Sequence, residues 1–484
     1  MFDWRRTKVR LVSVLGGILA LVLSPASDVA AKSRAKVQLS FCTLPELTGP
    51  AQCGTTYMRE NPADPSSRKI PVRIAVVPAK SSPLTDPIVP LMGGPGESAI
   101  SAAAIYARQF EALLEHRDLL LVDQRGTGQS APLRCDLYST AHPEASLRDV
   151  FPAAAAERCE TTLREQADLT QYGYARFADD LESIRIALGY NSLNIFAGSY
   201  GTRAAAVFLR AYPKSVRTAF LGSVVPIDIA QPLPMAQTAQ NAIDGLFEAC
   251  AADPSCHGAF PHLRAEFEEI EKQLTQGVEV TIPNQTGRFP LARGRVIEWM
   301  RSLLYRPKTA SDIPWYIHQA HGGNWDPIVA AILSESRAVD QELSLGLLFA
   351  ITCNEDIPFL DEHAITEKTQ GTYLGDYRVR QQQAACESWP RSPLPAGYRD
   401  PVRSSGPTLL VSGDNDGGTP LSFMAHVAAG FSKGVKVIAH GQGHTEWSDC
   451  VGGLYERLVE SGSTRELAGA TCAPMPRPAF KTTP

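Results

Sequence analysis

Three residues in this sequence follow apolar runs that end in loops of small residues, and their types suit acyl-transfer chemistry: Ser199, Asp416 and His444. Ser199 lies in residues 197–201 (Ala-Gly-Ser-Tyr-Gly), and an alanine-rich helical pattern follows at once. A serine at a tight turn between a strand and a helix exposes its hydroxyl and lies near the amides and positive dipole end of the helix. The pattern therefore predicts a nucleophile, with a helix N-cap serine as the alternative.

A serine nucleophile needs a base that takes its proton and a carboxylate that orients the base. One late loop, Ser-Gly-Asp-Asn-Asp-Gly-Gly-Thr-Pro, carries Asp414 and Asp416, and we favour Asp416 as the orienting acid with Asp414 as the alternative. The next loop contains Gly-Gln-Gly-His, in which His444 is the expected base. His440 competes with it, but His440 closes the preceding apolar run, whereas His444 lies in the glycine turn.

The negative oxygen that forms when a serine attacks a carbonyl group needs two amide donors. One is expected from Tyr200, the residue that follows the nucleophile. The loop at residues 93–96 (Gly-Gly-Pro-Gly) follows another apolar run and can supply the second. Proline has no amide hydrogen, so we expect the donor to be Gly94, with Gly93 as the alternative.

Continuous apolar runs that alternate with helical patterns predict a mostly parallel sheet with helices on both faces. We expect strands at residues 72–77, 88–92, 118–122, 194–197, 216–225, 408–411 and 435–438. Parallel strands bring the loops that follow them to one edge of the sheet. The three candidate residues would therefore meet there, and their chain order (Ser, Asp, His) is that of the α/β-hydrolase fold.

The order of the patterns predicts four parts of the chain. Residues 1–31 read as a signal peptide, and residues 32–225 as the first part of an α/β-hydrolase core that starts with a proline-rich extension. Helical patterns dominate residues 226–403, which we interpret as a cap inserted over the sheet edge. Residues 404–484 resume the core and end in a tail.

The composition excludes some partners and indicates export. Lys and Arg number 46 against 51 Asp and Glu, without a long basic run, so nucleic acid is not an expected partner. The first residues are basic, residues 11–23 are apolar, and small residues follow. This pattern is typical of a cleaved secretory signal and is too short for a comfortable membrane span. We expect a periplasmic or secreted protein without stable membrane association; the oligomeric state is not readable from the sequence.

The ten cysteines all follow that signal, and an even number in an exported chain predicts disulfides. They form no Cys-x-x-Cys pair and no histidines cluster around them, so neither a metal nor another cofactor is expected. Pairing of neighbours along the chain would close five short loops. The suggested pairs are Cys42–Cys53, Cys135–Cys159, Cys250–Cys256, Cys353–Cys386 and Cys450–Cys472.

The motifs, taken together, resemble a known family. Gly-Gly-Pro-Gly, Asp-Gln-Arg-Gly-Thr-Gly-Gln-Ser, Gly-Ser-Tyr-Gly-Thr, Gly-Asp-Asn-Asp-Gly-Gly-Thr-Pro and Gly-Gln-Gly-His occur in this order. This set is similar to that of exported α/β-hydrolase peptidases related to prolyl aminopeptidase, particularly the tripeptidyl-aminopeptidase-like branch, from about residue 53 to 472. The resemblance implies a serine exopeptidase with Ser199 as nucleophile, Asp416 as acid and His444 as base. Ala197 and Met92 depart from the family pattern, which has glycine and often histidine there.

An aminopeptidase must also hold the positively charged α-amine of its peptide substrate, which requires a carboxylate at a fixed distance from the nucleophile. We expect Glu355 to be this anchor, with Asp356 second; a solvated acidic pair at a helix end is the alternative. The first hypothesis is therefore a hydrolase that acts on peptides with a free N-terminus. A carboxylesterase is the alternative on the same fold, and the presence of all three triad residues disfavours a catalytically silent binding protein.

Overall fold

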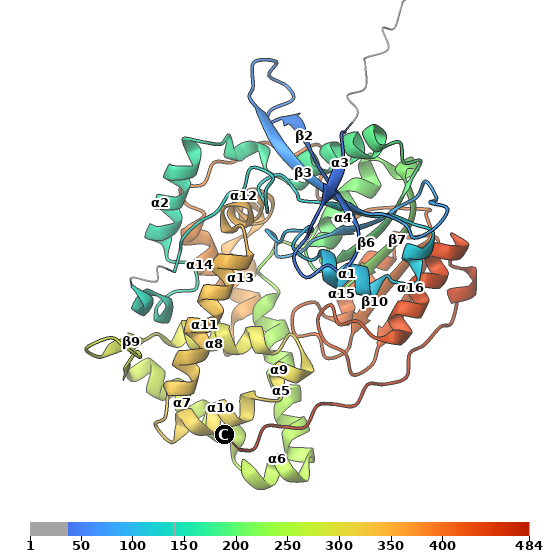
Figure 1. The fold of residues 1–484 in the computed structure, drawn as a ribbon. Coiled ribbons are helices and arrows are strands. Elements are labelled where there is room, and N and C mark those ends of the chain that lie inside the picture. Colours follow the sequence, from blue (N-terminus) through green and yellow to red (C-terminus); the bar gives the residue numbers. More distant parts are fainter. Residues whose placement is uncertain (1–36, 139–141, 484) are drawn as a thin grey trace, which may run out of the picture. The chain divides into compact units, whose positions relative to one another are not determined.

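The computed structural model describes residues 37–138 and 142–483. Its main feature is a nine-stranded sheet with the order β1-β2-β3-β5-β4-β6-β7-β10-β11 (Figure 1). The strands are β1 (Ser40–Cys42), β2 (Ala51–Arg59), β3 (Lys69–Val77), β4 (Ile88–Leu91), β5 (Leu119–Val122), β6 (Leu193–Gly198), β7 (Val216–Gly222), β10 (Thr408–Gly413) and β11 (Gly434–Ala439). Neighbouring strands from β5 to β11 in this order are parallel, and the pairs from β1 to β5 are antiparallel. The predicted mostly parallel sheet is confirmed.

Helices cover both faces of this sheet. On one face α3 (Tyr174–Leu188), α4 (Gly201–Ala211) and α15 (Leu421–Ala428) contribute to the larger apolar core. On the other face α1 (Ala103–Gln109) and α16 (Asp449–Ser461) contribute to a second core. Side chains of one strand point alternately to the two faces, so a fully apolar strand such as β5 fills both cores at once.

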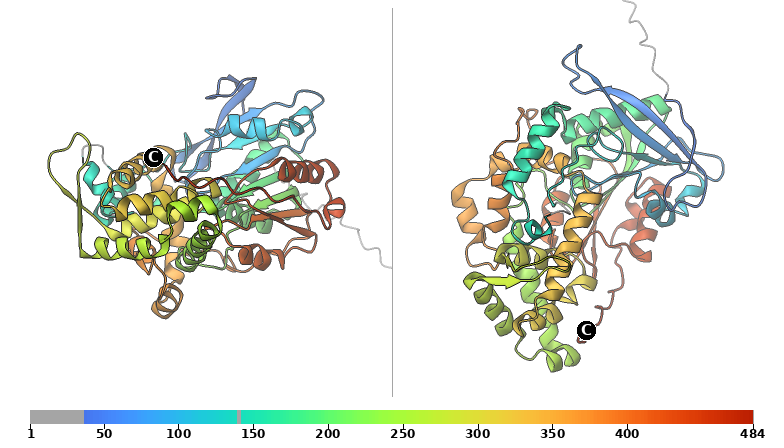
Figure 2. Two further views of the ribbon diagram at one scale, coloured as in Figure 1. Left: turned by 90° about the horizontal axis from the view of Figure 1, so that it is seen from below. Right: turned by 60° about the vertical axis from the view of Figure 1, so that its left-hand side comes forward.

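The segment between β7 and β10 is mostly helical and has an apolar core of its own. Its elements are α5 (Met235–Ala252), α6 (Pro254–Ala259), α7 (Leu263–Gln276), β8 (Val278–Val280), β9 (Phe289–Leu291), α8 (Arg293–Leu303), α9 (Pro307–Ala310), α10 (Ile313–His321), α11 (Asp326–Glu342), α12 (Leu345–Glu355), α13 (Glu362–Thr369) and α14 (Tyr377–Ala385). β8 and β9 form a separate two-stranded sheet. In both views of Figure 2 the yellow and gold helices of this segment lie together at one side of the main sheet.

Packing crosses the predicted limits of the cap, residues 226–403. Helix α12 lies within those limits, yet its side chains belong to the core of the main sheet, where they meet α2 (Ala153–Arg164). Conversely, Leu147 and Phe480 from outside the limits enter the core of the helical segment. The C-terminal tail reaches the region of α10 (Figure 1), and the Lys481 amide donates to the carbonyl of Ser311, between α9 and α10, at 3.1 Å.

The N-terminal region differs in part from expectation. The proline-rich extension contains β1 and the nine-residue β2, which pairs with β3 in antiparallel register and widens the sheet.

All five disulfides join the neighbouring cysteines that the sequence suggests. The predicted signal peptide, residues 1–31, lies outside the described residues. None of the helices in the described part is long and apolar enough to cross a membrane.

Candidate active site

Ser199 occupies a sharp turn between a buried strand and a helix. β6 ends at Gly198, α4 begins at Gly201, and Ser199 has a φ of 53°, a backbone conformation that non-glycine residues adopt only where the surroundings enforce it. A Cβ atom at Gly201 would lie 2.1 Å from the Leu91 carbonyl oxygen, so the helix can approach β4 only with glycine there. The turn lifts the serine hydroxyl out of the sheet edge, as a nucleophile requires.

The first position of this turn does not need glycine. Ala197 is fully buried within β6, where it pairs with residues of β4 and β7 and belongs to the main core. Alanine is therefore accommodated at this position within the main core.

His444 and Asp416 are hydrogen bonded. The Nδ1 atom of His444 lies 2.9 Å from Asp416 Oδ2 and 3.0 Å from Oδ1. The same carboxylate accepts the amides of Gly418 (2.8 Å) and Thr419 (2.9 Å), and the Thr419 hydroxyl at 2.6 Å. Burial alone would raise the pKa of Asp416, but the facing His444 and these hydrogen bonds outweigh it and lower the pKa. Asp416 is thus held as a carboxylate that orients the imidazole.

The alternative residues form a second pair with each other. His440 Nδ1 lies 2.8 Å from Asp414 Oδ2, and the Gly441 amide donates to Asp414 Oδ1 at 2.7 Å. His444 lines the cavity that contains Ser199, whereas His440 does not, and neither aspartate lines it. The fold therefore places one Asp–His pair beside the cavity of Ser199 and the other pair at the surface.

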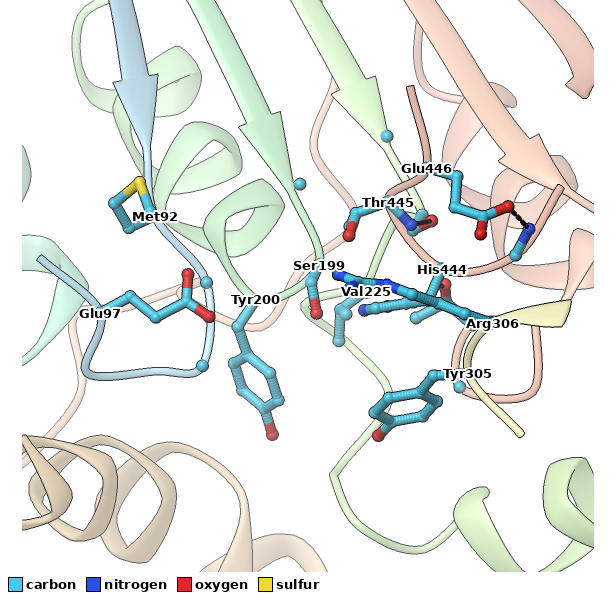
Figure 3. A pocket seen from close by; sticks show the side chains of 18 of the residues that line it. Met92, Glu97, Ser199, Tyr200, Val225, Tyr305, Arg306, His444, Thr445 and Glu446 are labelled. Carbon is cyan, nitrogen blue, oxygen red and sulfur yellow. Dashed lines mark hydrogen bonds between the residues drawn. The ribbon is translucent and has the colours of Figure 1, made fainter. Parts of the chain in front are cut away.

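Ser199 and His444 point into the same cavity (Figure 3). In the part of the chain that the structure describes, no hydrogen bond joins the Ser199 hydroxyl to the imidazole. Such contacts are often long in ligand-free enzymes and tighten when substrate binds. The arrangement is compatible with transfer of the serine proton to Nε2, the ring nitrogen that Asp416 leaves free.

The glycine loop contacts the nucleophile directly. A Cβ atom at Gly93 would lie 3.3 Å from the Ser199 Cβ and 3.7 Å from the Tyr200 amide nitrogen. Gly94 has a φ of +100°, which favours glycine, and it is exposed at the cavity wall. The amides of Gly94 and Tyr200 donate to no other backbone carbonyl within the described residues. Gly93 is the loop residue that lies against Ser199 and Tyr200, and Gly94 follows it at the cavity wall, so the oxyanion donors Gly94 and Tyr200 stay a prediction.

Met92 packs against the start of this loop. It stands where the related family often has histidine, and its sulfur accepts a hydrogen bond from Tyr106 at 3.3 Å. Both residues line the cavity. Methionine in place of histidine at position 92 therefore changes the cavity wall and leaves the backbone of the glycine loop in place.

The cavity has a volume of about 1120 Å³, which is ample for a peptide. Besides the loops of the sheet edge, helices α8, α11, α12 and α14 of the helical segment line it. Two of the six carboxylates that line the cavity are paired with arginines: Glu298 bonds to Arg301 and Arg378, and Glu335 bonds to Arg295. No group of three or more metal-ligating side chains occurs among residues 37–138 and 142–483.

Glu355 and Asp356 do not lie where the sequence suggests. Neither lines the cavity, and both are buried. Asp356 forms an ion pair with Arg203 of α4, at 2.7 Å, and Glu355 accepts the Tyr174 amide at 3.2 Å. The expected amine anchor at this helix end is therefore corrected: the carboxylates turn into the protein because a buried guanidinium and a buried amide need them.

Glu97 is the carboxylate that sequence reasoning missed. Its amide donates to the Gly93 carbonyl at 3.5 Å, which folds the glycine loop back beside Ser199. In Figure 3 its side chain points into the cavity, and in that view Ser199 lies between it and His444. Glu97 makes no ion pair or hydrogen bond with another described side chain, and burial raises its pKa although the Gly93 backbone, His444 and Arg306 oppose this. The sequence signal that could have identified Glu97 is an acidic residue directly after Gly-Gly-Pro-Gly.

The sequence matches known families and proteins over parts of its length. Residues 86–257 match the family of the alpha/beta hydrolase fold, and residues 371–472 match the family of TAP-like proteins. The putative hydrolase YuaR of Escherichia coli (strain K12) is 30% identical over 208 residues, 40% of this chain and 40% of that protein. The serine protease Hip1 of Mycobacterium tuberculosis (strain ATCC 25618 / H37Rv) is 24% identical over 422 residues, 78% of this chain and 79% of Hip1.

A third relative is the tripeptidyl aminopeptidase of Streptomyces coelicolor, which is 29% identical over 221 residues. That match spans 41% of this chain and 40% of the aminopeptidase. The chain thus spans less than half of YuaR and of the aminopeptidase, and most of Hip1.

Proposed function

Because this chain has the α/β-hydrolase fold and a TAP-like C-terminal part, we propose that it is a serine exopeptidase that acts through an acyl-enzyme. Its substrate is a peptide with a free N-terminus, from which it releases a residue or a short peptide. The names of two relatives, a tripeptidyl aminopeptidase and a serine protease, support hydrolysis of peptide bonds.

The chemistry follows from the residues around Ser199. The Ser199 hydroxyl attacks the carbonyl carbon while His444 takes its proton, and Asp416 stabilises the resulting imidazolium. The amides of Tyr200 and Gly94 stabilise the oxyanion. His444 then gives the proton to the leaving amine, so the peptide bond breaks and an ester to Ser199 forms. Water, activated by the same base, hydrolyses this ester and restores the hydroxyl.

The observation that carries the choice of substrate is the carboxylate of Glu97. An α-ammonium is a cation, and Glu97 is a cavity-lining carboxylate without a cationic side-chain partner among the described residues. Glu446, Asp449 and Glu456 also line the cavity, but Glu97 belongs to the glycine loop that lies against Ser199. Glu298 and Glu335 are already paired with arginines. Glu97 is partly buried, so an ion pair formed there with substrate is screened less by water than one at the surface. We therefore assign the amine anchor to Glu97.

An ester hydrolase is the second candidate, because the same nucleophile, base and oxyanion donors also cleave esters. A carboxylesterase does not need an amine anchor. The two functions therefore differ in one measurable property, the dependence of the rate on a free α-amine.

The test compares arylamides of short peptides with a free or an acetylated N-terminus. We expect the wild-type protein to cleave the free form much faster, and Glu97→Gln to lower kcat/KM for it by roughly 10- to 100-fold, the value of a hydrogen bond to a charged group. Hydrolysis of a neutral p-nitrophenyl ester should change little, because that substrate has no ammonium. Equal rates for free and acetylated peptides in the wild type would contradict the exopeptidase function.

Matched variants separate the anchor from a general charge effect. Glu456→Gln removes another cavity-lining glutamate, on α16, and is expected to keep the preference for free amines. Glu97→Asp should retain part of it because the charge persists on a shorter side chain. If the wild type prefers free amines and Glu97→Gln keeps that preference, the assignment of Glu97 is wrong while the exopeptidase function stands.

The compartment belongs to the same proposal. Five disulfides fit an exported protein, since such bonds persist in oxidising environments. We infer that the enzyme acts in the periplasm or outside the cell, on peptides that reach that space.

A further inference from the structure

The turn between α8 and α9, residues 304–306, is inserted between the two catalytic loops. The His444 amide donates to the Tyr305 carbonyl at 2.6 Å. A Cβ atom at Gly443 would lie 2.4 Å from that carbonyl oxygen, and one at Gly418 would lie 2.4 Å from the Tyr305 ring. One at Gly417 would lie 2.6 Å from the Leu304 carbonyl oxygen. The glycines beside the acid and the base therefore make room for this turn of the helical segment.

The Tyr305 side chain lies on the ring of the candidate base (Figure 3). The two ring centroids are 4.9 Å apart and the ring planes differ by 26°, which is a stacked arrangement. Asp416 bonds Nδ1 at one edge of the imidazole and fixes which nitrogen faces Ser199. A single edge contact leaves the ring able to tilt about that nitrogen. Tyr305 covers one face of the imidazole and opposes this tilt.

Tyr305 is itself held in place by a buried chain of charges. Arg301 donates to its hydroxyl at 2.7 Å and lies over its ring, with the guanidinium carbon 5.0 Å from the centroid. Glu298 accepts two hydrogen bonds from Arg301, at 2.8 and 2.9 Å, and lies 3.1 Å from Arg378 of α14. Side chains of α8 and α14 thus hold Tyr305 rigidly in place. Solvent in the place of the Tyr305 ring would not restrain the imidazole in this way.

We propose that Tyr305 is a positioning residue of the active site: its ring holds the His444 imidazole in the plane from which Nε2 takes the Ser199 proton. The inference rests on the proposed role of His444 as a base, and it does not depend on whether the substrate is a peptide or an ester. A proton acceptor must lie within hydrogen-bond reach of the hydroxyl, so a tilt of the ring lowers the rate of the chemical step.

The test uses a neutral p-nitrophenyl ester, with kcat and KM measured separately. Tyr305→Leu keeps the backbone carbonyl that holds His444 and removes the stacked ring. We expect kcat to fall roughly 10- to 100-fold, since small misplacements of catalytic groups have effects of that size, and KM to change little. Tyr305→Phe keeps the ring and loses only the hydroxyl bonded to Arg301, so it should restore kcat to within about 3-fold of wild type.

Gly418→Ala is a second variant that leaves Tyr305 unchanged but pushes its ring, because the added methyl group meets that ring. It should lower kcat in the wild-type background and add little to the loss in Tyr305→Leu, where the ring is absent. This non-additivity distinguishes an action through Tyr305 from a separate effect on the acid loop. If Tyr305→Leu does not fold, Gly418→Ala alone decides: a lowered kcat with unchanged KM supports the inference, and a kcat at the wild-type level overturns it.

An unchanged kcat in Tyr305→Leu, a loss confined to KM, or Tyr305→Phe as slow as Tyr305→Leu would overturn the inference. Thermal unfolding of each variant verifies that the compared proteins are folded. If wild-type protein hydrolyses no ester and Ser199 does not react with a fluorophosphonate probe, the hydrolase proposal itself fails, and this outcome is distinct from a failure of the Tyr305 variants alone.

Discussion

The loops after β10 and β11 carry two Asp–His pairs with nearly the same hydrogen-bond length. His444 lies 2.9 Å from Asp416, and His440 lies 2.8 Å from Asp414. Both pairs use Nδ1, and each pair joins the same two loops. The length of the bond therefore does not identify the pair that does chemistry.

What differs is the surroundings of the two pairs. The Asp416 side chain is 0% exposed and that of His444 11%, against 34% for Asp414 and 50% for His440. Asp416 also accepts bonds from Gly418 and Thr419, and His444 lines the cavity of Ser199. A catalytic pair is thus recognised by burial, by the number of groups that fix the carboxylate and by the nucleophile that it faces.

The strongest test exchanges the histidines. We expect His444→Gln to lower kcat on ester and peptide substrates by about 10⁴- to 10⁶-fold, because the serine then has no base. His440→Gln should leave kcat within about 2-fold, since its imidazole faces solvent. Steady-state kinetics of both variants, with circular dichroism as a check of folding, provide the measurement. A similar loss in both variants would contradict the assignment of one pair to catalysis.

The second test exchanges the acids. Asp416→Asn keeps the shape of the side chain but presents an amide to Nδ1, which favours the wrong tautomer of His444, and we expect kcat to fall about 10⁴-fold. Asp414→Asn is the matched change at the surface pair and should have no measurable effect on kcat. The reverse result, a large loss in Asp414→Asn only, would move the triad to the exposed pair.

The sequence was sufficient for the loops but not for the choice within them. Apolar runs end where strands end, because buried strands need apolar side chains and the residues after them need small side chains for tight turns. Ser199 and the two late loops could therefore be located. Asp414 and Asp416 are two residues apart on one loop, so only the approach of His444 and Thr419 in three dimensions separates them. Strand β2 was missed because Gln52, Gly54 and Thr55 interrupt any continuous apolar run in its sequence.

The amine anchor was misplaced for a similar reason. A helical pattern ending in Glu355 and Asp356 does not reveal what lies beyond the helix end. Arg203, which bonds Asp356, is 153 residues away in the chain, and it is buried on the helix that follows the nucleophile. Glu97 was visible in the sequence as an acid after the glycine loop, but its place in the cavity depends on how that loop folds against Ser199.

Glu355 provides the last and smallest test of the comparison, since it is a buried carboxylate to which no histidine or arginine side chain of the described residues is bonded. Burial raises its pKa from 4.5 to about 7. A folded-state pKa above the unfolded value means that the folded protein binds this proton more tightly. The contribution of protonated Glu355 to the free energy of unfolding is therefore complete below about pH 4.5 and is lost as the pH rises through about 7. This contribution amounts to roughly 3 kcal/mol.

Glu355→Gln removes this dependence, because the amide stays neutral and can still accept the Tyr174 amide. The free energy of unfolding of the variant, relative to wild type, should increase by roughly 3 kcal/mol between pH 4.5 and pH 8. Urea unfolding at a series of pH values, with the disulfides intact, measures it, and Glu165→Gln at an exposed position is the control that should show no such trend. A difference that does not vary with pH would mean that Glu355 is ionised in the folded protein, as Asp416 is. In that case burial alone would not separate structural from catalytic carboxylates in this molecule, and the bonded partner of each carboxylate would be the deciding feature.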